Sequence, residues 1–114
     1  ADILQPDCSI TGGLTAFRRI MTLAKLQNIQ CYPHVWGSGV AVAVGLNAAF
    51  AMPDFPESLN PAPVYFELDR TENIFREEIN NNQLKIVNGY IECPQFEGLG
   101  IDINRELIAR YQIA

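Results

Sequence analysis

Two long stretches of the chain show the hydrophobic spacing of helices. From residue 14 to residue 27, apolar side chains recur with a helical period and basic side chains lie opposite them, which predicts an amphipathic helix. Residues 40–50 are apolar on nearly every side, so this second helix should be buried all round, with Ser38 as its N-cap. Asn104 is placed to cap a last short helix that ends near Tyr111.

Three short apolar runs, at residues 3–7, 29–34 and 64–68, predict strands. Asp7 closes the first run and His34 closes the second, and each is followed by glycines and a predicted helix. That order is typical of consecutive βα units, in which parallel strands carry the functional side chains at their ends. The sequence therefore predicts an α/β fold built on parallel strands.

The rest of the chain is predicted to be loop, hairpin and short helix. Four prolines between residues 52 and 63 exclude a regular element there. Residues 72–82 predict one or two turns of polar helix. Residues 84–87 and 90–92 flank an Asn-Gly pair, which favours a tight β-hairpin turn.

Composition and charge are those of one globular domain covering residues 1–114. Apolar residues make up 48% and charged residues 18% of the chain, so it can bury a core. The net charge of −5 divides into +1 for residues 1–53 and −6 for residues 54–114, and this acidity argues against a nucleic-acid partner. Three scattered cysteines, with no secretory leader or long apolar run, predict reduced thiols, a cytoplasmic location and no membrane association.

Asp7 and His34 are the strongest candidates for chemistry. Equivalent ends of neighbouring parallel strands lie about 4.8 Å apart, so a carboxylate and an imidazole placed there can form an acid–base pair in which the carboxylate orients the ring. Two simpler interpretations stay open. Asp7 can be a turn residue that accepts from the amide of Ser9 or Ile10. His34, as the lone histidine, can have a structural or surface role.

A zinc site is not expected from the sequence. Cys8, Cys31 and His34 supply at most three ligands, and their spacing lacks a second paired motif. We therefore predict no metal site in this chain.

Four motifs, in the same order, resemble the C-terminal part of the mandelate racemase and muconate lactonizing branch of the enolase superfamily. They are QPDCSITGG at 5–13, PHVWGSG at 33–39, FELDRTEN at 66–73 and GLGI at 98–101. The resemblance implies the end of a TIM-like (β/α)7β barrel, with its sixth, seventh and eighth strands and their helices, followed by a C-terminal β-hairpin and a short helix. The expected fold class is therefore α/β, as a partial barrel.

The resemblance also implies roles for three carboxylates and the histidine. His34 would remove or return the proton on the carbon next to a substrate carboxylate, and Asp7 would hold the imidazole in place. Glu67 would hydrogen-bond a substrate carboxylate oxygen as negative charge builds on it, which a protonated carboxyl in an apolar site can do. Asp69 is the alternative to Glu67 for that role.

The loop after His34 supplies two further candidates. Trp36 and Ser38 would line the substrate pocket, and the helix start offers backbone amides to an anion. Simple packing explains Trp36 equally well. The sequence departs from the family pattern at Glu97, where a proline is common, and this departure affects the local turn.

Several parts of the family's active site have no match in the sequence. The magnesium ion that the resemblance implies is held by carboxylates on earlier strands, and the lysine acid/base and the capping-domain loops also lie elsewhere. We therefore expect no cofactor in this chain alone, with magnesium in the parent family, and no catalysis by the chain alone.

Three accounts of the chain remain open. It is a fragment of an acid-sugar dehydratase or racemase, with dehydration favoured; a self-assembling, non-catalytic homo-oligomer; or half of a split enzyme whose partner chain supplies the missing strands. Unpaired edges of parallel strands favour the homo-oligomer, because such edges recruit other strands. An adjacent reading frame that encodes the missing strands would favour the split enzyme. A small carboxylate would be the substrate only in a complete enzyme.

Overall fold

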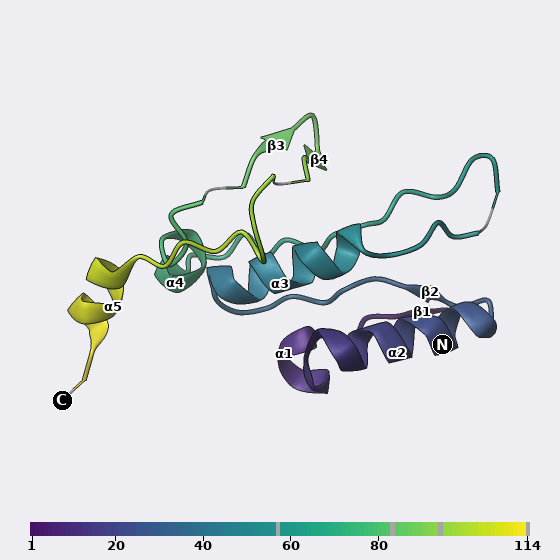
Figure 1. Cartoon of the computed structure of the whole chain (residues 1–114), viewed down its shortest axis with the longest axis horizontal. Helices are drawn as coiled ribbons and strands as arrows, with labels where there is room; N and C mark the ends of the chain where they lie inside the picture. Colours follow the sequence, from purple (N-terminus) through teal and green to yellow (C-terminus); the bar gives the residue numbers. More distant parts are fainter. Residues whose placement is uncertain (57, 83, 94, 114) are drawn as a thin grey trace.

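The computed structural model describes residues 1–56, 58–82, 84–93 and 95–113 of the chain (Figure 1). Its N-terminal half consists of two βα units. Their elements are β1 (Ile3–Leu4), α1 (Cys8–Thr11), α2 (Gly13–Leu26), β2 (Gln30–Cys31) and α3 (Gly39–Phe50). Figure 1 shows α1 and α2 beneath α3, with the chain of β2 passing between them. Both long helices are confirmed, and the single turn α1 is an addition to the predicted elements.

β1 and β2 pair in parallel, as predicted. The hydrogen bonds continue beyond the strands themselves. The amide of Tyr32 donates to the carbonyl of Leu4 at 3.0 Å, and further along the amide of His34 donates at 3.1 Å to the carbonyl of Pro6. This extension holds the ends of the two apolar runs side by side. It places His34 next to the residue that follows Pro6, which is Asp7.

The amphipathic helix α2 packs on α3 through one apolar cluster. Phe17 of α2 is 1% exposed and Ala48 of α3 is 3% exposed. The cluster consists of Cys8, Phe17 and Ala48, with Leu14, Met21, Val44 and Met52 packed against it. The stripe with helical spacing that the sequence shows is therefore the face that α2 buries.

A second cluster covers another part of α3. Its members are Val35, Val42 and Leu46, with Ala41, Phe66, Leu68, Leu84 and Ile91 packed against them. Contacts in both clusters explain why α3 lacks a polar stripe. Burial is not complete, because Phe50 at the end of α3 is 44% exposed. Gly45 allows the close approach of Val35, since a Cβ at position 45 would collide with a methyl group of that valine.

The prediction of a third strand at residues 64–68 is wrong. The segment has no regular secondary structure, yet its side chains reach the neighbouring elements. Phe66 and Leu68 join the second cluster, and the ring of Tyr65 packs edge-on against Tyr32 with centroids 5.6 Å apart. A strand needs hydrogen-bonded neighbours, and Pro63 lacks the amide that a ladder would use. Phe66 and Leu68 bury their side chains by packing and not by strand pairing. The described residues therefore form two parallel strands, where three were expected.

The C-terminal part contains the elements predicted for it. They are α4 (Ile74–Glu77), β3 (Ile86–Val87), β4 (Tyr90–Ile91) and α5 (Arg105–Tyr111). β3 and β4 form an antiparallel hairpin. The Asn-Gly turn between them has positive φ angles of 51° and 81°, as a type I′ turn requires. None of the helices in the described part of the chain is long and apolar enough to span a membrane.

Asparagine side chains organise the return of the chain toward α5. Asn104 caps α5, as predicted, by accepting from the amide of Leu107 at 3.1 Å. Asn80 accepts from the amide of Asp102 at 2.8 Å and donates to the carbonyl of Gly100 at 3.3 Å. These bonds connect the segment after α4 to the segment before α5. No local pattern in the sequence predicts this connection.

Candidate active site

Asp7 and His34 form a hydrogen-bonded pair at the ends of the paired strands. Nδ1 of His34 lies 3.1 Å from Oδ2 of Asp7. The carboxylate is buried, with 7% of its side chain exposed, whereas 38% of the imidazole side chain is exposed. The structure therefore brings together the two residues that the sequence selected, with the ring open on one side and anchored on the other.

The second oxygen of Asp7 is also in use. Oδ1 accepts from the amide of Ser9 at 2.6 Å, and Asp7 is the N-cap residue of α1. The backbone carbonyl of Asp7 accepts from the hydroxyl of Thr11 at 2.8 Å. The turn interpretation of Asp7 is confirmed by the bond to Ser9, and the contact of the other oxygen with His34 is compatible with the acid–base prediction. Two fixed bonds leave the carboxylate little freedom to rotate.

The pKa of Asp7 lies below its ordinary value of 3.8. Burial of the carboxyl group acts to raise this pKa, but hydrogen bonds from the Ser9 amide and from His34 outweigh the burial. Asp7 is therefore ionised at neutral pH and can only accept a hydrogen bond. A neutral His34 then carries its proton on Nδ1, which leaves Nε2 as the ring nitrogen able to take a proton from another molecule.

Glu67 forms a hydrogen bond with Gln5, which precedes Asp7 by two residues. Its Oε2 accepts from Nε2 of Gln5 at 3.3 Å. The side chain of Glu67 is exposed, so the described residues do not enclose it in the apolar site that the proposed role would need. This contact places Glu67 beside Gln5, the residue that directly follows β1.

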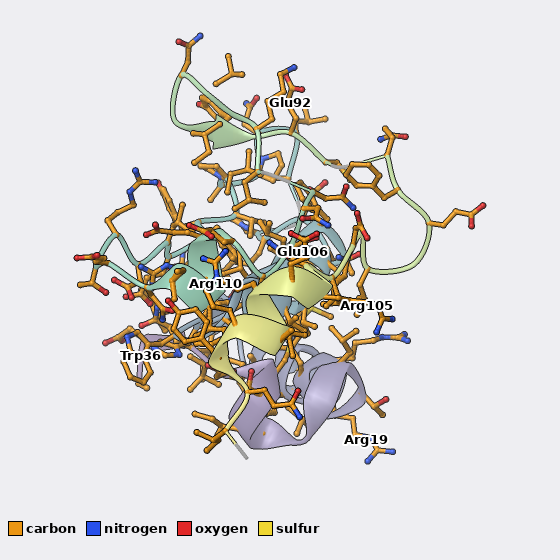
Figure 2. The ribbon with its side chains drawn as sticks, turned by 90° about the vertical axis from the view of Figure 1, so that its left-hand side faces the viewer. Arg19, Trp36, Glu92, Arg105, Glu106 and Arg110 are labelled. Carbon is orange, nitrogen blue, oxygen red and sulfur yellow. The ribbon has the colours of Figure 1, made fainter. Side chains whose placement is uncertain are left out.

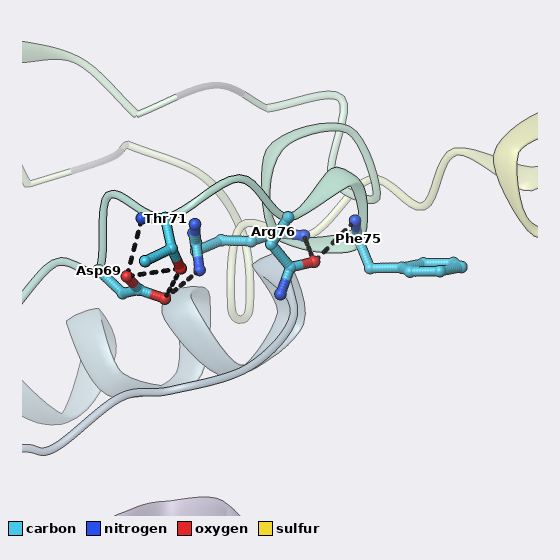
Figure 3. A network of polar contacts seen from close by, with 5 residues as sticks. Asp69, Thr71, Phe75 and Arg76 are labelled. Atoms are coloured by element: carbon cyan, nitrogen blue, oxygen red, sulfur yellow. Dashed lines mark hydrogen bonds and ion pairs between the residues drawn. The ribbon is translucent and has the colours of Figure 1, made fainter.

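Asp69, the alternative to Glu67, is committed to a local network (Figure 3). Its oxygens accept from the amide and hydroxyl of Thr71, both at 2.9 Å for Oδ1, and form an ion pair with Arg76. These bonds lower the pKa of Asp69, with the Thr71 amide the largest cause. Asp69 therefore has a structural role in ordering residues 69–76, and Glu67 remains the candidate.

The two candidates after His34 lie at the surface. Trp36 is 72% exposed, and Figure 2 shows its indole at the edge of the molecule. Simple packing in the core is therefore not its role in this structure. Ser38 occupies the predicted N-cap position of α3, but its hydroxyl makes no capping hydrogen bond.

The described residues do not provide a metal site. No group of three or more histidine, cysteine, aspartate or glutamate side chains comes together in that part of the chain. Cys8 and Cys31 are buried, and burial raises the pKa of both thiols, which disfavours the thiolates that zinc needs. Both oxygens of Asp7 already have partners. The residues that the structure describes therefore do not form a site for the magnesium ion that the resemblance implies.

Sequence reasoning did not single out Gln5 as a functional residue. A signal for it exists, because side chains two positions apart in a strand point to the same face, and Gln5 precedes Asp7 by two. The sequence predicts the bond of Asp7 to the Ser9 amide, but it gives no separate signal for the short helix α1 that this cap begins. Both follow from local spacing once the strand end is known.

Comparison with known proteins accounts for this arrangement. Residues 1–107 match the family model described as "Enolase C-terminal domain-like". The chain belongs to this family. The enolase-like chain is also 41% identical, over 112 residues, to D-galactarolactone cycloisomerase of Agrobacterium fabrum, and 27% identical, over 111 residues, to arabinonate dehydratase of Saccharolobus solfataricus. These matches cover 98% and 97% of the chain, but only 30% and 27% of the two relatives.

Solved structures confirm the fold of this enolase-like chain. The 3,6-anhydro-D-galactonate cycloisomerase of Zobellia galactanivorans superposes with a TM-score of 0.79 at 36% identity, covering 97% of the chain and 29% of the neighbour. A candidate mandelate racemase of Bordetella bronchiseptica superposes with a TM-score of 0.83 at 30% identity, covering 99% and 28%. The chain thus spans about 30% of the curated relative that it matches at 41% identity. The resemblance to the mandelate racemase and muconate lactonizing enzymes is confirmed, as a fragment of their fold.

Proposed function

We propose that the chain supplies the histidine half of an acid–base active site that acts on a sugar-derived acid. The observation that carries this proposal is the hydrogen bond of 3.1 Å between Nδ1 of His34 and Oδ2 of Asp7. The bond joins an exposed imidazole to a buried, ionised carboxylate at the ends of two parallel strands. That geometry is suited to a general base, because the carboxylate holds the tautomer and stabilises the imidazolium that forms.

The proton transfer involves one atom of this chain directly. Nε2 of His34 takes the proton from the carbon next to the substrate's carboxyl group, and the ring becomes a cation. Nδ1 keeps its proton and its bond to Asp7 throughout. When the proton is delivered back to the substrate, or to the position vacated by a leaving group, the ring returns to its neutral form. General acid–base catalysis of this kind contributes about 100- to 10,000-fold to rate.

Charge that builds on the substrate needs donors as well as a base. We assign Glu67 to a carboxylate oxygen of the substrate, and Trp36 and Ser38 to the wall of its pocket. These assignments rest on matching motifs and on the contact that brings Glu67 beside the end of β1. Magnesium, which the family uses, would be held by residues outside this chain, because the described residues offer no ligand set for it.

The substrate class is taken from two of the relatives that the chain matches. One is a D-galactarolactone cycloisomerase at 41% identity, and another is a 3,6-anhydro-D-galactonate cycloisomerase at 36%. The names of both relatives indicate substrates that are cyclic derivatives of sugar acids. These two names support cycloisomerization as the reaction, ahead of the dehydration that the sequence favoured and ahead of racemization. In all three reactions we assign the proton transfer to His34.

A second polypeptide, or a further copy of this one, would complete the site. In the described residues, β1 and β2 pair only with each other, so each has an open edge that can accept a strand. We propose that a chain carrying the earlier barrel strands covers these edges. The alternative is a non-catalytic homo-oligomer that uses the same edges. Native mass spectrometry separates them: a fixed multiple of one mass supports the oligomer, a second chain of different mass supports the partner chain, and a strictly monomeric species at high concentration contradicts the oligomer.

A chimera tests the catalytic role. The chain would replace the matching 30% of D-galactarolactone cycloisomerase, and exchange of the substrate's α-proton would be followed by NMR in D2O with magnesium. We expect exchange in the chimera, a loss of about 100-fold or more in the His34→Asn variant, and none from the 114-residue chain alone. Arg19→Lys, at an exposed position of α2, is the matched control. Exchange that persists in a folded His34→Asn chimera would refute the role.

A further inference from the structure

A pocket of about 260 Å³ lies apart from the Asp7–His34 pair. The first turns of α3 form one wall. The second consists of residues 68–70, 76 and 77, and the third consists of Asn80, Asn82, Leu84 and Ile86. None of the residues proposed for catalysis lines it. The pocket combines a few charged groups with an apolar floor, which is the usual composition of a site for a small ligand.

Arg76 is the unusual member of this pocket. Its side chain is only 7% exposed. Nη1 is paired with Asp69, whereas Nη2 is buried and has no hydrogen-bond partner. Figure 3 shows one guanidinium nitrogen turned to Asp69 and the other turned away from it. A buried, charged donor without an acceptor is costly and rare in folded proteins, so it indicates a missing acceptor oxygen.

The neighbouring carboxylate of Asp69 is already in use as an acceptor. Asp69 already accepts from Thr71 and from Nη1 of Arg76. Figure 3 shows these bonds holding the carboxylate on one side of the guanidinium. Nη2 has no acceptor among the described residues, so an oxygen of a bound molecule can take that place.

The charges around the pocket limit what that molecule can be. Arg70 and Arg76 are balanced by Asp69 and Glu77 among the lining residues. A dianion such as phosphate would meet two carboxylates there, whereas a single negative charge would meet less repulsion. A planar carboxylate matches the geometry of a guanidinium group. The apolar floor, which includes Val42 and Leu84, favours a ligand with a hydrocarbon body.

We propose that this pocket binds a small monocarboxylate, with an oxygen of the ligand accepting from Nη2 of Arg76. The hydrocarbon part of the ligand lies against Val42, Leu68 and Leu84. The site shares no residue with Asp7, His34 or Glu67, so it stands independently of the function proposed above.

The test uses propionate as the probe and the isotope-labelled 114-residue chain. Sodium propionate is titrated at pH 7 and constant ionic strength, and the resonances of the Arg76 side chain and of the Val42 and Leu84 amides are followed. We expect saturable shifts confined to the pocket. Propionamide, which has the same shape without the charge, should bind at least ten-fold more weakly, and chloride should produce no saturation.

Two variants that keep the net charge locate the binding group. Arg76→Lys keeps a cation beside Asp69 but removes the second planar donor, so propionate affinity should fall at least ten-fold. Arg70→Lys, at an exposed lining position, should change affinity less than two-fold. The proposal is overturned by an absence of saturable shifts, by equal binding of propionamide, or by unchanged affinity in Arg76→Lys. If Arg76→Lys does not fold, the comparison of propionate with propionamide on the wild-type chain decides the question.

Discussion

Asp7 and His34 are separated by 27 positions in the sequence, and their side chains meet at 3.1 Å. One hydrogen bond of the extended strand pairing, from the amide of His34 to the carbonyl of Pro6, brings them together. Asp7 also begins α1 through its bond to Ser9. The same carboxylate therefore connects local folding to the candidate site, so its removal should affect both.

The first prediction concerns the pH dependence of stability. The folded chain holds the pKa of Asp7 below 3.8, so the unfolded chain takes up this proton at a higher pH. The stabilisation is fully present above pH 3.8 and is lost as the pH falls through that value toward the folded pKa. Asp7→Asn should flatten this slope and cost about 1–3 kcal/mol at pH 7. Urea unfolding between pH 3 and pH 7 measures both, and Asp2→Asn, at an exposed position, should retain the slope.

The second prediction concerns the contact between Gly45 and Val35. Alanine is normally better than glycine in a helix by about 1 kcal/mol, but a Cβ at position 45 would collide with Val35. Gly45→Ala should therefore destabilise the chain by about 1–3 kcal/mol. Val35→Ala removes the colliding methyl group, so the double variant should lose less stability than the two single losses added together. Additive losses in chemical denaturation would show that this contact is not the cause.

The third prediction concerns the asparagines that hold the C-terminal segment. Asn80 accepts from the amides of Asn82 and Asp102 and donates to the carbonyl of Gly100. Asn80→Ala should cost about 1–3 kcal/mol and speed hydrogen exchange of the Asp102 amide. Asn81 is exposed, and its side chain bonds only the side chain of Asp102 among the contacts described. Asn81→Ala keeps the backbone bond to Asp102 and should cost less than about 0.5 kcal/mol. Equal exchange in both variants would contradict the role of Asn80.

The fourth prediction concerns the anchoring of α5. Leu107 is 1% exposed, whereas its neighbour Ile108 is 45% exposed. Leu107→Ala should cost about 2–5 kcal/mol, because it leaves a cavity where the helix docks. Ile108→Ala should cost about 0.5 kcal/mol or less. Thermal unfolding followed by circular dichroism compares the two, and similar midpoints would show that α5 contributes little to the core.

Much of the local structure was predictable because it depends on neighbours in the sequence. The apolar spacing of residues 14–27 and 40–50 predicted α2 and α3, and the Asn-Gly pair predicted the hairpin of β3 and β4. The cap at Asn104 follows the same logic. Residues 64–68 are an exception. They have the apolar pattern of a strand but form none, because a strand also requires a hydrogen-bonded neighbour.

By itself, the sequence determined the α/β class, the family and the pairing of Asp7 with His34, since these depend on residue spacing and on motifs that survive in order. Only the tertiary structure decided what each group contacts. It showed that Asp7 serves two partners, that Glu67 bonds Gln5 in an exposed position, and that Arg76 has one buried nitrogen without a partner. Spacing along the chain specifies periodic elements, but burial and hydrogen-bond partners depend on segments far apart in sequence, which only folding brings together.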